Sequence, residues 1–174
     1  MILTSMHETP DDLVALQNVL DNSIASAGPH LKSMFKEPLT ASEVVDELSS
    51  IFEVHFATIT PSGAPFVAPI DSLFYCGQLW IGIPSAAVRA SFVRRDQRVS
   101  VSYTRGESFC LIVHGRAVEV RQDDPLAKQY GAYSDGEYMK LYGEKWLDWV
   151  EQQRAKSGWG DLWCIDASKM FVKR

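Results

Sequence analysis

The chain has 174 residues, enough for one domain with a real core, and its 46% hydrophobic and 22% charged residues are ordinary for a globular protein. A formal net charge of −5 argues against a nucleic-acid-binding protein, which usually carries a basic face. No apolar run is long enough to cross a membrane and no basic leader segment opens the chain, so we expect a cytoplasmic protein without a membrane partner.

Two helices are predicted ahead of the first strand. Apolar residues recur at three- and four-residue steps over 10–25, and Ala27-Gly28-Pro29 ends that pattern. A capping box from Thr40 to Glu43 then predicts a second helix over about 41–51. We expect this helical N-terminal extension, residues 1–52, to cover a barrel end or a neighbouring subunit.

From residue 53 the pattern changes to that of strands, which are predicted at 53–60, 65–76, 79–83, 99–104 and 109–120. Pro69 lies inside the second strand and predicts a bulge or an edge position, because proline donates no hydrogen bond to a sheet. Gly115 predicts a bulge or a close approach in the fifth.

A short basic helix over 86–95 separates the third and fourth strands. Arg89 on this helix is the best candidate for binding a phosphate, because a guanidinium is a permanently charged fork of donors. Ser85 just before the helix would add a hydroxyl, and first-turn N–H groups would add more. Arg94, Arg95 and Arg98 are expected on the surface or paired with acids.

The C-terminal part is predicted to hold helices and a closing strand. Asp124 and Pro125 are typical of a helix start, and a helix over 137–155 carries an apolar stripe that includes Trp146 and Trp149. These two tryptophans are expected in the core or in a dimer interface. A strand is predicted over 162–172.

Hairpins in sequence with one inserted helix indicate a mainly β fold, a β-barrel with flanking helices. We expect a single domain over 1–174, divided into the N-terminal extension 1–52, a barrel core over 53–122, and helices with the closing strand over 123–174. Three cysteines without CxxC spacing predict reduced, buried thiols, and four scattered histidines predict no metal site.

Three stretches together resemble the pyridoxamine 5'-phosphate oxidase-like split-barrel family of flavin and deazaflavin oxidoreductases. They are the opening hairpin over 57–70, the segment over 79–101 with the basic helix, and the run over 114–120. The resemblance covers about residues 53–122. It implies a six-stranded antiparallel split barrel that works as a homodimer, with two cofactor sites at the subunit interface.

The same resemblance implies where the cofactor lies. Its phosphate would sit beside Arg89, and the flavin ring would follow the strand backbone near Pro69, Ile70 and Asp71, with its far side covered by the partner chain. Asp71 would meet a substrate or stand at the barrel mouth. Trp163, like Trp159, lies where relatives place residues over the cofactor, so it would stack on the ring or line a substrate pocket.

Several positions depart from the family pattern. Ile83, which we assign to the cofactor site, stands where many members have a threonine whose hydroxyl touches the phosphate. Ala87 and Val88 replace polar residues of the pyridoxamine phosphate oxidases, and Cys110 replaces a glutamine that contacts flavin. Gln97 replaces the usual proline. These changes speak against true pyridoxamine phosphate oxidase activity.

The expected function is therefore FMN-dependent oxidoreduction of a small organic substrate by hydride transfer at a dimer interface. Alternatives within the fold are an F420-dependent reductase, in which Arg94 or Arg95 would contribute, and a binding or sensing protein that has lost the redox site. A haem-binding protein is a further alternative, with His55 or His114 as an axial ligand.

Overall fold

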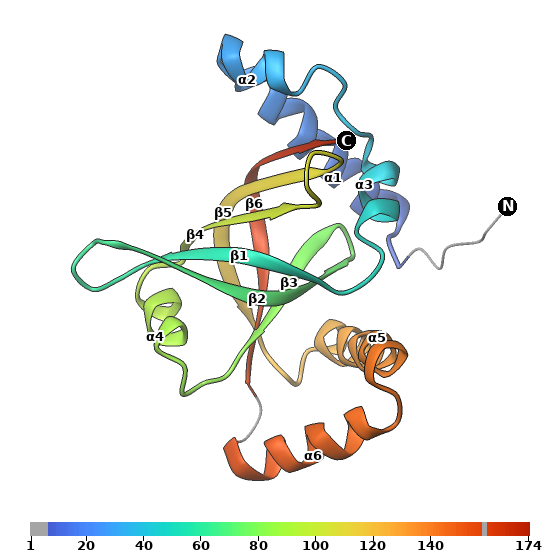
Figure 1. The fold of residues 1–174 in the computed structure, drawn as a ribbon, viewed down its shortest axis with the longest axis vertical. Coiled ribbons are helices and arrows are strands. Elements are labelled where there is room, and N and C mark those ends of the chain that lie inside the picture. Colours follow the sequence, from blue (N-terminus) through green and yellow to red (C-terminus); the bar gives the residue numbers. More distant parts are fainter. Residues whose placement is uncertain (1–6, 158–159) are drawn as a thin grey trace, which may run out of the picture.

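Six strands close into a barrel in the computed structural model, which describes residues 7–157 and 160–174 (Figure 1). All neighbouring strands are antiparallel, in the order β1-β2-β3-β6-β5-β4. The strands are β1 (Phe52–Ile59), β2 (Pro65–Tyr75), β3 (Gln78–Ile83), β4 (Arg98–Thr104), β5 (Cys110–Val120) and β6 (Asp161–Lys173). The expected fold class, a mainly β six-stranded barrel with flanking helices, is confirmed.

Helices lie at both ends of this barrel (Figure 1). They are α1 (Pro10–Ser26), α2 (Pro29–Met34), α3 (Ala41–Glu47), α4 (Val88–Arg95), α5 (Pro125–Tyr142) and α6 (Lys145–Ser157). Helices α1 to α3 lie at the end where the chain terminates, and Leu16 and Leu20 of α1 join the barrel core. The N-terminal helices thus cover one end of the barrel, as expected. Helices α5 and α6 lie at the opposite end.

The N-terminal helices differ from expectation in two details. Helix α3 has the predicted capping box but ends at Glu47, because the chain must turn into β1 at Phe52. Helix α2 was not expected. Pro29 reads as the end of α1, yet proline is also favourable at the first position of a helix, and here it starts α2.

Strands β5 and β6 pair across almost their whole length and shift register between His114 and Gly115. A Cβ atom at Gly115 would lie 2.1 Å from the Asp166 carbonyl oxygen, far inside van der Waals contact. The bulge and close approach predicted at Gly115 are both confirmed.

Strand β2 pairs with β1 along most of its length but with β3 only near its C-terminal end. It pairs with β1 from Pro65 to Ser72 without a register shift, whereas β3 covers only its residues 72–75. Residues 65–71 therefore present an open edge. Pro69 stands at this edge, where a missing N–H breaks no ladder bond, so the edge prediction is confirmed and there is no bulge. This edge positions the candidate site.

The predicted single helix over 137–155 is wrong. The chain forms two helices, which separate at Gly143, whose φ is +69°. Glycine adopts this left-handed conformation without steric cost, and its N–H bonds back to the Met139 carbonyl oxygen as a helix terminator does. Asp124 and Pro125 start α5 as predicted.

Helix α5 is attached to the outside of the barrel by aromatic packing. Trp80 of β3 stacks on Tyr130 with ring centroids 4.7 Å apart, and Tyr75 of β2 stacks on Tyr133 at 5.3 Å. Burial raises the pKa of the Tyr133 hydroxyl to about 12, and it raises the pKa of Tyr75 and Tyr130 as well. The neutral forms of these phenols are therefore the ones that the fold stabilises.

We expect the free energy of unfolding to fall as the pH rises above about 10, the ordinary pKa of tyrosine. A raised pKa in the folded state contributes stability that is complete below the unfolded pKa and is lost as the pH climbs toward the folded one. Urea midpoints at pH 8, 10 and 11.5 measure this loss. Tyr133→Phe should flatten the dependence, while Tyr142→Phe, at a side chain 60% exposed, is the matched control. Equal slopes in wild type and Tyr133→Phe would contradict the assignment.

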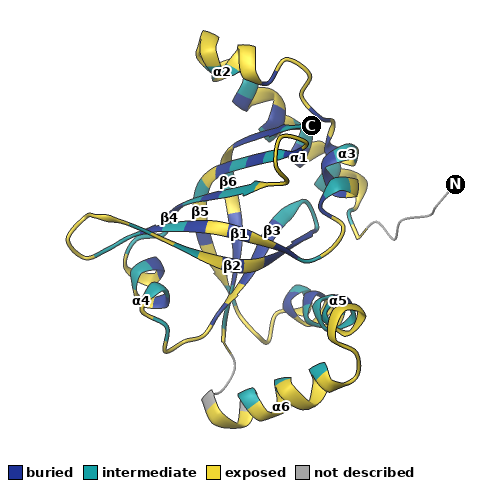
Figure 2. Cartoon of the chain, in the orientation of Figure 1, coloured by how far each residue is buried: buried dark blue, intermediate teal, exposed yellow. Residues whose placement is uncertain are grey.

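Helix α6 stands away from the barrel and is mostly exposed along its length (Figure 2). Trp146 is half-buried, but Trp149 is 50% exposed and Leu147 42%. Within one chain, Trp149 is thus not a core residue, and the dimer-interface alternative for this stripe stays a prediction. No helix in the described part of the chain is long and apolar enough to cross a membrane.

Candidate functional site

A cleft of about 410 Å³ lies along the open edge of β2, and we call it the cofactor cleft. It is lined by β1 and β2 residues, the end of β3, α4 and α5: Glu53, Pro69, Ile70, Asp71, Ser72, Leu73, Gly82, Arg89, Tyr130, Ser134 and Tyr138. The structure therefore brings together four of the seven residues that the sequence placed at a cofactor site, namely Pro69, Ile70, Asp71 and Arg89.

Arg89 is fixed at one wall of the cleft. It lies in the first turn of α4, and its Nη1 donates a hydrogen bond of 2.9 Å to the Pro69 carbonyl oxygen on the open edge. A guanidinium has five N–H donors, so others stay available for a ligand. No side chain caps the N-terminus of α4, which starts after Ala87. Charge and helix dipole both favour an anion here.

Ser85 lies outside the cofactor cleft. Its Oγ donates a 2.9 Å hydrogen bond to the Asp161 carboxylate at the start of β6. The same carboxylate forms an ion pair with Arg94 of α4. The Ser85 hydroxyl thus helps to join the loop before α4 to β6, and it would have to leave Asp161 in order to reach a phosphate.

The side chains of Ile83 and Trp163 point into the barrel. Ile83 is fully buried and Trp163 is 1% exposed, and both belong to the hydrophobic core. Only their backbones can approach a ligand, and stacking of Trp163 on a cofactor outside the barrel does not fit this placement. Trp159 lies outside the described residues.

The other three arginines of this segment are exposed on the surface, as expected, and each is also bonded within the chain. Arg94 pairs with Asp161, and Arg98 pairs with Asp96, whose pKa falls to about 2 beside that guanidinium. Arg95 donates to the carbonyl oxygens of Ile59 and Thr60 at 2.7 and 2.6 Å, tying α4 to the β1–β2 turn. Neither Arg94 nor Arg95 lines the cofactor cleft.

Helix α5 contributes residues that sequence reasoning missed. The Tyr138 hydroxyl donates a 3.1 Å hydrogen bond to Asp71, and its ring stacks on Trp146 with centroids 4.1 Å apart. Burial, and then the neighbouring Asp71 carboxylate, raise the pKa of Tyr138. Glu53 faces Asp71 across the β1–β2 ladder. No local signal identifies Tyr138, because its role depends on how α5 packs against the barrel.

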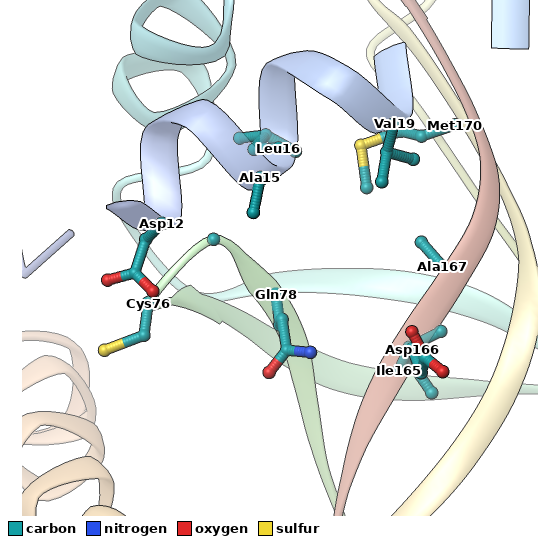
Figure 3. A pocket seen from close by; sticks show the side chains of 11 residues that line it. Asp12, Ala15, Leu16, Val19, Cys76, Gln78, Ile165, Asp166, Ala167 and Met170 are labelled. Atoms are coloured by element: carbon teal, nitrogen blue, oxygen red, sulfur yellow. The ribbon is translucent and has the colours of Figure 1, made fainter. Parts of the chain in front are cut away.

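A second pocket, of about 270 Å³, lies between α1, the β2–β3 turn and β6 (Figure 3). Its charged lining residues are Asp12 and Asp166, and no cation lines it. Cys76 also lines it, but burial raises the pKa of this thiol to about 11, so it is a poor nucleophile at neutral pH. This pocket does not fit an anionic cofactor.

The cysteines and histidines form no metal site in the described residues. The three cysteines are free; Cys164 is buried, and Cys76 and Cys110 are half-buried rather than fully buried. His114 shares a 2.8 Å hydrogen bond through Nδ1 with Ser100. His55 is exposed and lies directly opposite Pro69 in the β1–β2 ladder, beside the cofactor cleft.

Solved structures with known cofactor classes share this fold. A FAD-binding protein of Mesorhizobium loti has a TM-score of 0.53 at 16% identity, with 78% of this chain and 93% of that protein covered. An F420 reductase has a TM-score of 0.52 at 13% identity, covering 72% and 94%. The haem storage protein HutZ of Vibrio cholerae has a TM-score of 0.55 at 18% identity, covering 76% and 93%.

The chain has the split-barrel fold. The resemblance found in the sequence is thereby confirmed for the architecture, since identities this low establish the fold alone. One matched protein is longer, and this chain spans 50% of it. No protein-family model and no curated protein matches the sequence. The three neighbours named above are a FAD-binding protein, an F420 reductase and a haem storage protein, so the fold leaves the cofactor to be argued from the cleft itself.

Proposed function

We propose that this protein is an FMN-dependent oxidoreductase that acts on a small organic molecule at the interface of a homodimer. The observation that carries the proposal is the position of Arg89. Its guanidinium is held beside the open edge of β2, between an uncapped helix N-terminus and the backbone of Pro69. The groups that would bind the cofactor's phosphate are thus adjacent to the edge along which its ring would lie.

The residues present fit FMN. A monophosphate needs a few strong donors. The Arg89 guanidinium would supply them together with the first-turn N–H groups of α4, except that of Ala90, which already bonds within the turn. Apart from Pro69, which has no N–H and whose carbonyl oxygen accepts from Arg89, the edge over 65–71 would offer backbone groups not paired with β3 to a flavin ring. Ile83 offers no hydroxyl, so Arg89 would carry more of the phosphate binding than in relatives with a threonine there.

The electrostatics of the cleft favour FMN over F420. Glu53 and Asp71 line the cleft together with a single arginine, so its side chains supply one positive and two negative charges. A longer, acidic cofactor tail would need additional cations. Arg94 and Arg95, the cations proposed for that role, are engaged by Asp161 and by the β1–β2 turn.

A homodimer would complete the site. The cleft is open, and the apolar side chains of Val67 on β2 and Val88 on α4, which lie near it in sequence and fold, are 57% and 56% exposed. A partner chain packed over the cleft would bury both valines. Sedimentation equilibrium should give twice the chain mass of 19.5 kDa, and a monomer at micromolar concentration would argue against the shared site.

The bound FMN would supply the hydride chemistry through its N5 atom. The chain's own tasks are to hold the phosphate with Arg89, to orient the ring along 69–71, and to shape the substrate side with Tyr138 and Asp71. The test is anaerobic reduction of the reconstituted protein by NADPH, NADH or dithionite. Bleaching of the flavin band followed by reoxidation with a substrate supports an enzyme. Flavin that binds but is never turned over by any substrate would favour the sensing alternative.

Haem binding is a second candidate, and the position of His55 favours it. This imidazole is exposed directly across from Pro69, at the rim of the cofactor cleft, where it could ligate an iron. Addition of hemin should then give a Soret band that His55→Ala abolishes and His30→Ala leaves unchanged. Absence of such a band leaves FMN as the better assignment.

A further inference from the structure

A larger hollow of about 620 Å³ shares Tyr130 with the cofactor cleft, and we call it the α5 hollow. It is formed by α5, the segment before it and the start of β6: Gly82, Gln122, Ala127, Lys128, Tyr130, Gly131, Ala132, Ser134, Asp135, Gly160, Asp161 and Leu162. Gly82, Tyr130 and Ser134 line both this hollow and the cofactor cleft, so the two spaces meet there.

The hollow exists because its walls are built from residues with little or no side chain. A Cβ atom added at Gly131 or Gly82 would meet no atom within 4 Å. Gly160 instead brings the chain close to β3, since its Cβ would lie 3.0 Å from the Ile83 carbonyl oxygen. Ala127 and Leu162 complete a mostly apolar wall. The space therefore suits a flat or bulky apolar group.

The charges at the rim of the hollow are unequal. The Asp161 carboxylate is taken by Arg94 and Ser85, and the Asp135 carboxylate accepts from the Trp146 indole N–H at 3.3 Å. Lys128 makes no hydrogen bond or ion pair through its ammonium within 7–157 and 160–174. The indole N–H is neutral, so Asp135 keeps its negative charge. Lys128 is the one cation among the described residues that line the hollow, so it is the group that would meet an acid.

We propose that the α5 hollow binds a small organic anion with an apolar ring or chain body, its acid group at Lys128 and its body reaching toward the cofactor cleft. That this anion is the substrate rests on the proposed function; that it binds does not. The shared wall of Gly82, Tyr130 and Ser134 puts one end of such a molecule next to the edge where the flavin ring would lie.

The test is isothermal titration calorimetry of the full chain with 2-naphthoate and, as a neutral twin, 2-naphthamide, without flavin and with saturating FMN. For a molecule of this size we expect naphthoate to bind with a dissociation constant between about 0.05 and 1 mM. Lys128→Gln should weaken the binding of naphthoate by about three- to tenfold and leave the affinity for the amide unchanged. The effect is modest because a half-solvated ion pair contributes little binding free energy. Lys145→Gln on α6 is the matched control.

Filling the hollow is the second arm. Gly131→Leu should weaken both ligands by more than about tenfold, whereas Gly136→Leu, on the same helix but lining neither space, should leave both unchanged. Both changes replace a helical glycine with a better helix former, so folding is expected in each. Equal affinity for acid and amide, or unchanged binding in Gly131→Leu, would overturn the inference. So would a Gly131→Leu variant that changes the sedimentation mass rather than binding.

The two proposals fail separately. Binding of naphthoate to a protein that takes up no FMN would support the α5 hollow and defeat the proposed function. Uptake of FMN without any naphthoate binding, whether flavin is absent or saturating, would support the proposed function and defeat the α5 hollow as a binding site.

Discussion

Replacing Arg89 by Gln is expected to weaken FMN binding by about 10- to 100-fold, the loss that follows removal of a charge-assisted hydrogen bond to an anion. Arg89 is the only cation that lines the cofactor cleft among the described residues, so no neighbour can take over its role. The dissociation constant is measured by quenching of flavin fluorescence. Arg89→Lys should recover part of the affinity, because it keeps the charge but loses the fork of donors.

The matched control is Arg98→Gln. Arg98 is also an exposed arginine of this segment, but its guanidinium is bound to Asp96 and does not line the cleft. The FMN affinity of the Arg98→Gln variant should equal that of the wild type. Arg89 also donates to the Pro69 carbonyl oxygen, so thermal unfolding of each variant separates loss of binding from loss of structure. Equal weakening in both variants would mean that general charge, and not this position, attracts the cofactor.

Replacing Gly115 by Val is expected to destabilise the barrel by about 3 kcal/mol or more, because even the first side-chain atom would collide with backbone rather than with a flexible side chain. The Cβ position is 2.1 Å from the Asp166 oxygen and 2.9 Å from its carbonyl carbon. Strands β5 and β6 would have to separate at their bulge. Chemical unfolding measures the loss, and for a chain of this length the thermal midpoint should fall by about 6–12 °C.

Gly136→Ala is the control for this prediction. Gly136 lies inside α5, its added Cβ meets nothing within 4 Å, and alanine is about 1 kcal/mol better than glycine in a helix. Its midpoint should therefore stay the same or rise. A Gly115→Val protein as stable as the wild type would show that the β5–β6 bulge is not as closely packed as described.

Local patterns in the sequence predicted most of the elements. The alternation of β4, the capping box of α3 and the Asp124–Pro125 start of α5 are short-range signals, and each is found in the structure. The error in the C-terminal helices has a physical origin. The apolar stripe of the predicted 137–155 helix continues across Gly143, so periodicity alone does not show the break there. Glycine permits either a helix or its end, and the tertiary fold decided between them.

The candidate site was predicted in part. Arg89 was proposed from its residue type on the basic helix and Pro69 from the resemblance, and the fold brings the two into contact. Ile83 and Trp163 were assigned by their positions in the family pattern, but strand alternation already points Leu79, Ile81 and Ile83 to one face, and that face is the core. Tyr138 was out of reach, because the docking of α5 depends on rings from β2 and β3 that no local pattern connects to it.

The central claim is that the cleft beside Arg89 binds one FMN per chain. The most direct measurement is the visible absorbance spectrum of the protein as purified and after titration with FMN and removal of free flavin. We predict flavin bands that saturate at about one FMN per chain, with release of a molecule of FMN mass on denaturation. A colourless protein that retains no flavin at millimolar FMN would contradict the account.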